Sequence, residues 1–283
     1  MIAPEGFELG EELSRDSTGI LFAATQTRLS RTVTLKILRP EFADHAKAKA
    51  IFLAERELVT GLENPNLLLT IDVGELDGRP WFVTESMSEP RLESCMDGMQ
   101  ELRAVRMALG LAQALHYLAQ RGLIYKNVCP KNVLLPRPNA PKLITFRHVR
   151  RAEEAMSFQG ANVQSGRYCA PELTRTDLGP VTSKVNTYAV GAILYELLAD
   201  QPLLDGDSAA ARAAHAAGDI PPLKTVRGFL RDRAYSVVSR LMAHDPHQRC
   251  DSAAAVALLE AYANDPLVAN PLQSTRKKRK RRR

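Results

Sequence analysis

Short runs of apolar and β-branched residues dominate the first third of the chain and predict strands. Residues 19–26 (GILFAATQ) and 31–38 (RTVTLKIL) are two such runs with a short polar stretch between them, which predicts two adjacent strands. A further pair of runs lies within residues 66–85, on either side of Asp77-Gly78. Because Asp-Gly is typical of a tight two-residue turn, this pair predicts a β-hairpin.

One segment of the same region has helical spacing instead. Within residues 46–65, four residues fall on one face of a helix: Phe52, Leu58, Val59 and Leu62. Pro65 predicts the end of this helix. The remaining two thirds of the chain are mainly helical by pattern. The helices are expected at residues 103–121, 187–199, 234–244 and 252–263, and two short strands at 132–135 and 142–145.

These elements predict an α+β protein with a small lobe before a larger one. We expect a β-rich N-terminal lobe over residues 1–86 and a mainly helical C-terminal lobe over residues 87–266. The periodicity stops at Asp265, so residues 267–283 are expected to be a disordered basic tail. A length of 283 residues, 45% of them hydrophobic and 25% charged, is typical of a globular protein with a substantial core.

The positive charge of the chain is concentrated at its end. The last eight residues, 276–283, are all Lys or Arg; without them the 38 basic side chains fall to 30, against 32 acidic ones. The body of the protein therefore has a net charge of about −2.

Other general features indicate a reducing, cytoplasmic setting. No apolar run approaches the roughly 20 residues that cross a bilayer, and we see no secretory signal at the start. The four cysteines are far apart and form no C-x-x-C pair, so the sequence predicts no structural metal. They are Cys95, Cys129, Cys169 and Cys250.

Five motifs occur in a fixed order along the chain. They are VTLK at residues 33–36, FLAERELVTGLENPNLL at 52–68, WFVTESM at 81–87, YCAPEL at 168–173 and LMAHDPHQR at 241–249. In this order and spacing the chain resembles the eukaryotic-like Ser/Thr protein kinase family in its bacterial form, over nearly its whole length. The resemblance implies a bilobal protein-kinase-like fold.

The resemblance also implies a nucleotide site. Lys36 takes the place of the family's strand lysine and Glu55 that of its partner on a helix. The backbone near Glu85 and Met87 corresponds to the hinge between the lobes. The other positions of the implied site are Gly19, Leu21, Thr34, Asn132 and Leu134.

The residues that carry the family's chemistry are changed. The segment GLIYKNVCPKNVLL, residues 122–135, resembles the catalytic loop H-R-D-[LI]-K-P-x-N-[IV]-L-L. Asn127 stands in place of the catalytic Asp and Cys129 in place of the phosphate-facing Lys, whereas Asn132, a metal ligand in the family, is retained. Thr145 stands in place of the Mg²⁺-binding Asp.

These changes predict a pseudokinase with no intact catalytic residue. Asn127 is neutral and cannot accept a proton at pH 7, a role typically worth about 10²–10⁴ in rate. Thr145 offers a hydroxyl where Mg²⁺ prefers a carboxylate. In the glycine-rich loop, Ser14 and Asp16 replace two glycines, and Asp16 puts a negative charge where backbone N–H groups should close on phosphates.

Nucleotide binding is expected to be weak. Thr34 replaces the small Ala that by resemblance lies over adenine, which adds a β-branched side chain to the roof of the pocket. We expect weak or no Mg-ATP binding, with metal-independent binding of an adenine nucleotide as the alternative. Mg²⁺ is expected to bind poorly, with Asn132 as the candidate ligand.

Structural roles are expected for several other residues. By resemblance, Glu172 and Arg249 form an ion pair in the C-terminal lobe, and Asn186 accepts hydrogen bonds that anchor the catalytic loop. Cys129 and Cys169 are interpreted as packed small apolar residues rather than as reactive thiols.

Three functions stay open. The first is a regulatory or scaffolding pseudokinase whose partner is an active kinase or signalling protein, and the second is a slow Ser/Thr kinase that recruits another carboxylate. The third is an interaction module targeted by Arg276–Arg283, which is otherwise an idle solvated end. Polybasic segments gain roughly 1 kcal/mol per residue near an anionic membrane. No aromatic residue interrupts the run, so base stacking is not indicated. Because bacterial kinases of this family often have a membrane span after the kinase domain, the resemblance favours membrane proximity over nucleic acid.

Overall fold

The computed structural model describes residues 3–137, 140–144, 148–154, 166–206 and 208–269. The chain divides into two compact units. The first comprises Met1–Pro90 with Ile144–Arg147, and the second comprises Arg91–Leu143 with His148–Arg283. The division thus falls a little after residue 86, where the sequence placed it.

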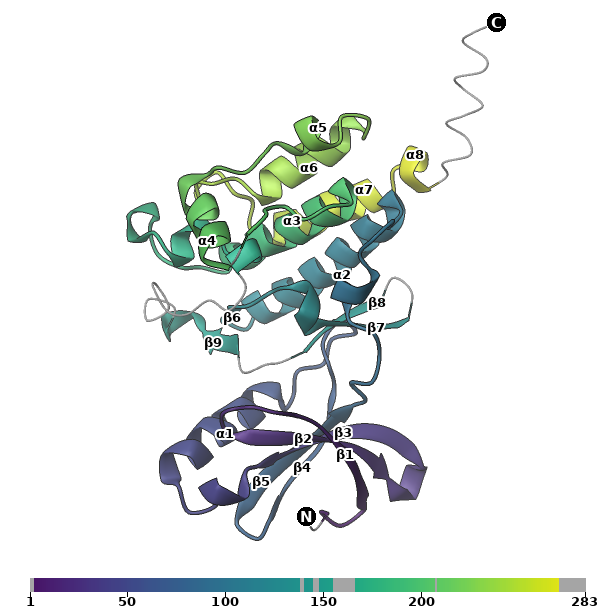
Figure 1. Ribbon diagram of the computed structural model, residues 1–283, viewed down its shortest axis with the longest axis vertical. Helices are drawn as coiled ribbons and strands as arrows, with labels where there is room; N and C mark the ends of the chain where they lie inside the picture. Colours follow the sequence, from purple (N-terminus) through teal and green to yellow (C-terminus); the bar gives the residue numbers. More distant parts are fainter. Residues whose placement is uncertain (1–2, 138–139, 145–147, 155–165, 207, 270–283) are drawn as a thin grey trace, which may run out of the picture. The chain divides into compact units, whose positions relative to one another are not determined.

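The first unit is built on one antiparallel sheet with strand order β1-β2-β3-β5-β4 (Figure 1). Its strands are β1 (Phe7–Arg15), β2 (Gly19–Gln26), β3 (Arg31–Leu38), β4 (Thr70–Leu76) and β5 (Arg79–Glu85), and one helix, α1 (Ala46–Val59), packs against β5. The strands predicted at 19–26 and 31–38 are confirmed with those bounds. The hairpin is also confirmed, because Asp77 and Gly78 both have positive φ, 50° and 71°, as the two-residue turn requires.

Two features of this unit differ from the prediction. Helix α1 ends at Val59 rather than near Pro65, because Thr60 is extended and Gly61 has a φ of 86°. Leu62 is buried, but it lies beyond the helix. Strand β1 was not predicted; it is an edge strand of which only Phe7 is buried, so it carries no apolar alternation.

The second unit is mainly helical, with two small two-stranded sheets. Its helices are α2 (Glu101–Ala119), α3 (Lys184–Ala199), α4 (Ser208–Ala217), α5 (Leu223–Val226), α6 (Asp232–Leu241), α7 (Ser252–Ala263) and α8 (Pro266–Ala269). Strand β6 (Leu123–Tyr125) pairs with β9 (Val149–Arg151), and β7 (Val133–Arg137) with β8 (Ala140–Leu143). Helix α3 is buried over nearly its whole length and contacts α2, α6 and α7 (Figure 1).

The sequence located α2, α3, α6 and α7 but missed α4, α8 and the single turn of α5. Helix α4 has the sequence SAAARAAHAA, in which small residues give no large apolar stripe. Helix α8 lies beyond Asp265, where the periodicity stops, and includes residues expected to belong to the tail. The rest of that tail, residues 270–283, lies outside the described residues.

The predicted ion pair of the second unit is confirmed. Arg249 donates to both carboxylate oxygens of Glu172, at 2.5 and 3.0 Å, and both side chains are fully buried. The Arg249 guanidinium also donates to the backbone oxygens of Ala243, Lys184 and His244. A buried charge needs partners on every side, and this arginine has them.

The anchor expected at Asn186 is present with the opposite polarity. Its Nδ2 donates to the backbone oxygen of Tyr125 at 3.2 Å, whereas its buried Oδ1 has no hydrogen-bond partner in the described part of the chain. The prediction that Asn186 accepts hydrogen bonds was therefore wrong. The amide still ties α3 to β6.

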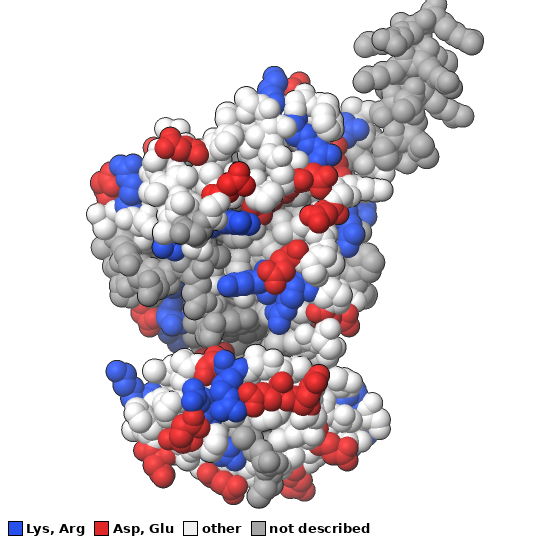
Figure 2. All heavy atoms as spheres, in the orientation of Figure 1, with Lys and Arg blue, Asp and Glu red and all other residues white. Residues whose placement is uncertain are grey.

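The surface agrees with a body of nearly zero net charge. Figure 2 shows acidic and basic side chains interspersed on the visible face of each unit, with no extended patch of one sign. Among the described residues, no helix combines the length and the apolar character that crossing a bilayer requires.

Candidate functional site

The predicted site residues fall into two groups, one in each unit. Those of the first unit surround Lys36 on β3, which is 5% exposed. Its Nζ donates to the two carboxylate oxygens of Glu55 on α1, at 2.8 and 2.7 Å, so the predicted ion pair is confirmed. The rings of Phe52 and Phe82 lie 5.6 and 5.7 Å from the ammonium and limit its access to water.

A second carboxylate also binds the same lysine. Asp16, in the turn between β1 and β2, places Oδ2 at 2.8 Å from Lys36 Nζ. Its Oδ1 accepts hydrogen bonds from the backbone N–H groups of Thr18, at 2.9 Å, and Gly19, at 2.7 Å. Gly19 is required at this point, because a Cβ there would lie 2.7 Å from Lys36 Cε.

The surroundings of Asp16 favour its charged form. Burial alone would raise the pKa of this carboxyl, but the charge of Lys36 and the hydrogen bonds from Lys36, Gly19 and Thr18 outweigh burial and lower it. Asp16 is therefore an ionised carboxylate held by an ammonium and two backbone donors. The sequence predicted its unfavourable charge but not these contacts.

The backbone at the predicted hinge also has internal partners. Met87 N donates to Thr34 Oγ1 at 3.0 Å, and Glu85 O accepts from Thr84 Oγ1 at 3.0 Å. A carbonyl can accept a second hydrogen bond, but a backbone N–H group has only one to give. Thr34 is 2% exposed, so water does not compete for this contact. The sequence predicted the added bulk of Thr34 but not its hydrogen bond to Met87. The side-chain hydroxyl, which Ala lacks, was the signal that could have indicated this bond.

Leu21 completes the predicted residues of the first unit. It lies on β2, half-buried, and pairs across the sheet with Lys36. The first unit thus brings together the predicted residues Gly19, Leu21, Thr34, Lys36, Glu55, Glu85 and Met87.

The catalytic-loop residues lie in the second unit, after β6. Asn127 is 3% exposed, and its amide nitrogen lies 3.5 Å from His148 Nε2. Asn132 Nδ2 donates to Asn127 O at 2.9 Å, and Asn132 N donates to Cys129 O, also at 2.9 Å. The retained Asn132 therefore holds the loop closed on itself. Thr145 lies outside the described residues.

The other two predicted residues of this unit are packed. Cys129 and Leu134 are each 1% exposed, and Leu134 pairs with Lys142 on β8. Cys169 is also buried, and burial raises the pKa of its thiol to about 12. The interpretation of Cys129 and Cys169 as packed residues agrees with this burial, and Cys169 is not an activated thiol.

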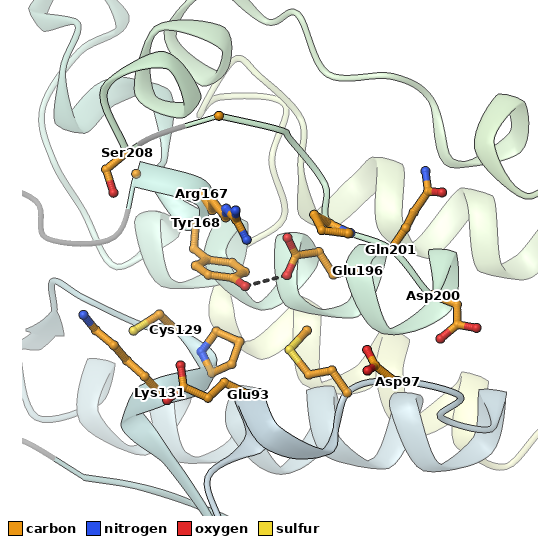
Figure 3. Close-up of a pocket in the computed structure, with 15 residues that line it drawn as sticks. Glu93, Asp97, Cys129, Lys131, Arg167, Tyr168, Glu196, Asp200, Gln201 and Ser208 are labelled. Atoms are coloured by element: carbon orange, nitrogen blue, oxygen red, sulfur yellow. Dashed lines mark hydrogen bonds between the residues drawn. The ribbon is translucent and has the colours of Figure 1, made fainter.

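A cavity of about 510 Å³ adjoins the catalytic loop within the second unit (Figure 3). At its centre the Tyr168 hydroxyl donates to a Glu196 carboxylate oxygen at 2.5 Å, and the other oxygen accepts from Leu203 N at 2.8 Å. Burial raises the pKa of Glu196. Lys131 and Arg167 lie toward one end of the cavity, and Asp97 and Asp200 toward the other (Figure 3). The sequence analysis did not identify this cavity.

The described residues contain no group of three or more His, Cys, Asp or Glu side chains placed to hold a metal ion. The polar groups of the predicted nucleotide site are also already paired within the protein. Lys36 has two carboxylates, and the N–H group of Met87 has a hydroxyl. Donors that the resemblance assigns to a nucleotide therefore already have partners within the protein.

Comparison with known proteins places the chain in a family. The model of the protein kinase domain matches residues 7–260. Serine/threonine-protein kinase PknB of Mycobacterium leprae is 28% identical over 273 residues, which are 92% of this chain and 43% of that protein. PknB of Mycobacterium tuberculosis is 29% identical over 260 residues, 88% of this chain and 41% of that protein.

A probable serine/threonine-protein kinase of Streptomyces coelicolor is 28% identical over 258 residues, 87% of this chain and 38% of that protein. The chain thus spans only about two fifths of the length of these relatives. The predicted α+β fold with a β-rich and a helical lobe is confirmed. Because the family model covers most of its length, the chain belongs to the protein kinase domain family, and its relatives are bacterial kinases of the Ser/Thr type.

Proposed function

We propose that this chain is a pseudokinase: a protein-kinase domain that does not transfer phosphate and acts as a regulatory or scaffolding partner. The observation that carries the proposal is the position of Asp16. By resemblance, Lys36 and the backbone N–H groups near Gly19 are the donors that hold nucleotide phosphates. Here the Asp16 carboxylate already binds Lys36 Nζ and the backbone N–H groups of Thr18 and Gly19.

The charge balance around Lys36 supports weak nucleotide binding. One ammonium faces two carboxylates, Asp16 and Glu55, so the cluster has a net charge of −1 before any phosphate arrives. At about 4 Å, two like charges repel by roughly 4 kcal/mol at an effective dielectric constant of about 20. A phosphate must therefore displace Asp16 or bear this repulsion without a well-held Mg²⁺.

The hinge adds a second obstacle. Adenine recognition at a hinge needs a free backbone donor, and the N–H group of Met87 is bound to Thr34. A purine that takes this N–H leaves the Thr34 hydroxyl buried without its partner, which costs about 1–3 kcal/mol. We therefore propose that Mg-ATP binds weakly or not at all.

The catalytic loop supports the same conclusion. Asn127 has an amide where a proton acceptor is needed. The relatives are named as kinases, but they are 28–29% identical. We infer that this chain lacks the phosphate transfer for which its relatives are named, because of the substitutions at Asn127, Cys129 and Thr145.

The decisive experiment measures transfer of radiolabelled γ-phosphate from ATP to the protein itself and to a generic substrate. We expect no transfer above that of Lys36→Ala. Transfer that Lys36→Ala abolishes would overturn the proposal.

A second candidate is a slow Ser/Thr kinase. The intact ion pair of Lys36 and Glu55 favours it, since this pair is the retained part of the family's machinery. Thermal stabilisation by ATP, measured with and without Mg²⁺, separates the two. A shift that requires Mg²⁺ supports the slow kinase, whereas a metal-independent shift or none supports the pseudokinase.

We also propose that the basic segment Arg276–Arg283, which lies outside the described residues, brings the protein to anionic membranes rather than to nucleic acid. Its eight cationic side chains provide the attraction. Sedimentation with anionic liposomes, before and after deletion of residues 276–283, tests this. Unchanged sedimentation, or stronger binding to oligonucleotides than to liposomes, would contradict it.

A further inference from the structure

A second cavity lies in the helical unit, among α3, α5 and α6, and belongs to neither group of predicted site residues. Its volume is about 370 Å³, within the range of roughly 300–1,000 Å³ typical of small-molecule sites. Its walls come from one side of α3, from the linker between α4 and α5, and from α6 with the residues after it (Figure 1). The lining is mainly apolar and aromatic: Tyr188, Tyr195, Ile220, Pro221, Pro222, Leu223, Tyr235, Val238 and Met242.

Close packing of two helices fixes the floor of this cavity. Gly191 on α3 lies against the end of α6, where an added Cβ would be 2.6 Å from Met242 Cγ and 2.7 Å from Leu241 Cβ. Tyr188 and Tyr195 flank this contact on α3. The cavity is thus framed by a rigid, buried helix rather than by a loose surface loop.

Hydrogen bonds hold the rim in place. Tyr195 OH donates to Pro221 O at 2.8 Å, and Tyr235 OH donates to Arg227 O at 2.8 Å. His244 Nε2 donates to Ala216 O at 3.0 Å. The first contact secures the α4–α5 linker to α3, the second joins α6 to the residue after α5, and the third joins the segment after α6 to the end of α4. The first two use the polar ends of the tyrosines. The rings therefore present apolar faces to the cavity.

Two side-chain polar groups of the lining are not used in the hydrogen bonds described above, the Lys224 ammonium and the Ser239 hydroxyl, and both can donate. Lys224 Nζ lies 5.8 Å from the centre of the Tyr235 ring, which places its charge beside a wall of the cavity. Neither Lys224 nor the Ser239 hydroxyl has a side-chain hydrogen bond or ion pair within the described ranges. The lining contains no Asp or Glu; Asp219, in the same linker, does not belong to it. The cavity thus combines apolar walls with one cation.

We propose that this cavity binds a small amphipathic carboxylate. Its acyl or aryl body fits among Tyr188, Tyr195, Pro221 and Met242, and its carboxylate pairs with Lys224. An ammonium beside an aromatic wall, with no competing acidic side chain in the lining, selects an anion over a cation or a neutral ligand. The site is independent of Lys36 and Asp16, so the proposal stands whether or not the chain transfers phosphate.

The test compares octanoate with its neutral analogue octanamide, using the full chain with ¹³C-labelled methionine methyl groups. Titration calorimetry gives the affinity, and the Met242 methyl signal, assigned with Met242→Leu, reports the location. We expect saturable binding of octanoate that shifts the Met242 signal. Octanamide should bind about tenfold more weakly, because it lacks the charge-assisted hydrogen bond to Lys224.

Two variants complete the test. Lys224→Met should weaken octanoate binding about tenfold and leave octanamide unchanged, whereas Lys47→Met, at an exposed lysine of the first unit, should alter neither. Thermal melts without ligand establish that each variant folds. The proposal is overturned if octanoate does not bind saturably, if octanamide binds equally well, or if Lys224→Met binds octanoate as the wild type does. An absence of binding by both compounds would instead favour a side chain of a protein partner as the occupant.

Discussion

At the scale of single residues, Asp16 and Thr34 occupy donors that a nucleotide needs. Each is a substitution of a residue that the family keeps small, and each adds oxygen acceptors. Because the acceptors lie within 3.0 Å of Lys36 Nζ, Gly19 N and Met87 N, they satisfy groups that would otherwise need water or a ligand. Under the proposed function, these two side chains make contacts that a bound nucleotide makes in the active relatives.

Removing the Asp16 carboxylate should open the anion site. We predict that Asp16→Gly binds ADP or ATP without Mg²⁺ at least tenfold more tightly than the wild type, because Lys36 and two backbone donors become available and one negative charge is removed. Titration calorimetry measures the affinity. Glu11→Gln, which removes an exposed carboxylate from the neighbouring strand β1, should have no effect. Equal nucleotide affinity of Asp16→Gly and the wild type would contradict this role of Asp16.

The lowered pKa of Asp16 also predicts a pH dependence of stability. A carboxyl group whose pKa falls on folding stabilises the protein above its ordinary pKa, here 3.8, and this contribution is lost as the pH falls through the lower, folded value. We therefore predict that Asp16→Asn lowers the free energy of unfolding at pH 7. The difference from the wild type should shrink steadily below pH 4. Urea unfolding across this range measures it, and a difference independent of pH would show that the charge of Asp16 contributes nothing.

At the scale of elements, local patterns predicted β2, β3, the β4–β5 hairpin and α7. Strands such as β3 and β5 are buried over most of their length and form short apolar runs, and Asp77-Gly78 marks the turn. The pattern of apolar residues did not predict β1, whose side chains are mostly exposed, or α4, whose residues are mostly Ala. The chemical substitutions at the site could likewise be read from the sequence. The contact of Thr34 with Met87 could not, because it joins β3 to the segment after β5 and depends on sheet register.

The buried pair of Glu172 and Arg249 connects elements far apart in sequence and should be sensitive to removal of one partner. We predict that Glu172→Gln lowers the free energy of unfolding by about 3–5 kcal/mol, because it leaves the Arg249 charge buried without a counter-ion. The exposed pair of Arg15 and Glu12 provides the comparison, and Glu12→Gln should have a much smaller effect, because solvent screens that pair. Chemical denaturation measures both variants. Equal costs would mean that burial does not determine the strength of these pairs.

At the scale of the whole molecule, the proposed loss of phosphate transfer has a different cause in each unit. In the first unit the polar groups of the nucleotide site are present but already bound, at Lys36 and at Met87. In the second unit the group that should accept a proton is absent, because Asn127 is an amide. Phosphoryl transfer depends on positioned groups acting together, so correcting either unit alone should be insufficient.

This dependence can be tested by rebuilding the site in stages. We predict that Asn127→Asp with Thr145→Asp and Cys129→Lys yields little or no γ-phosphate transfer, because the nucleotide phosphates still meet Asp16. Adding Asp16→Gly and Thr34→Ala to those three should produce transfer above the background of Lys36→Ala. Radiolabelled ATP measures transfer by each variant, and thermal melts establish that each folds. If the substitutions at Asn127, Cys129 and Thr145 restored full activity alone, occupation of Lys36 by Asp16 would not block the site, and the inactivity would lie in the catalytic loop and the metal position.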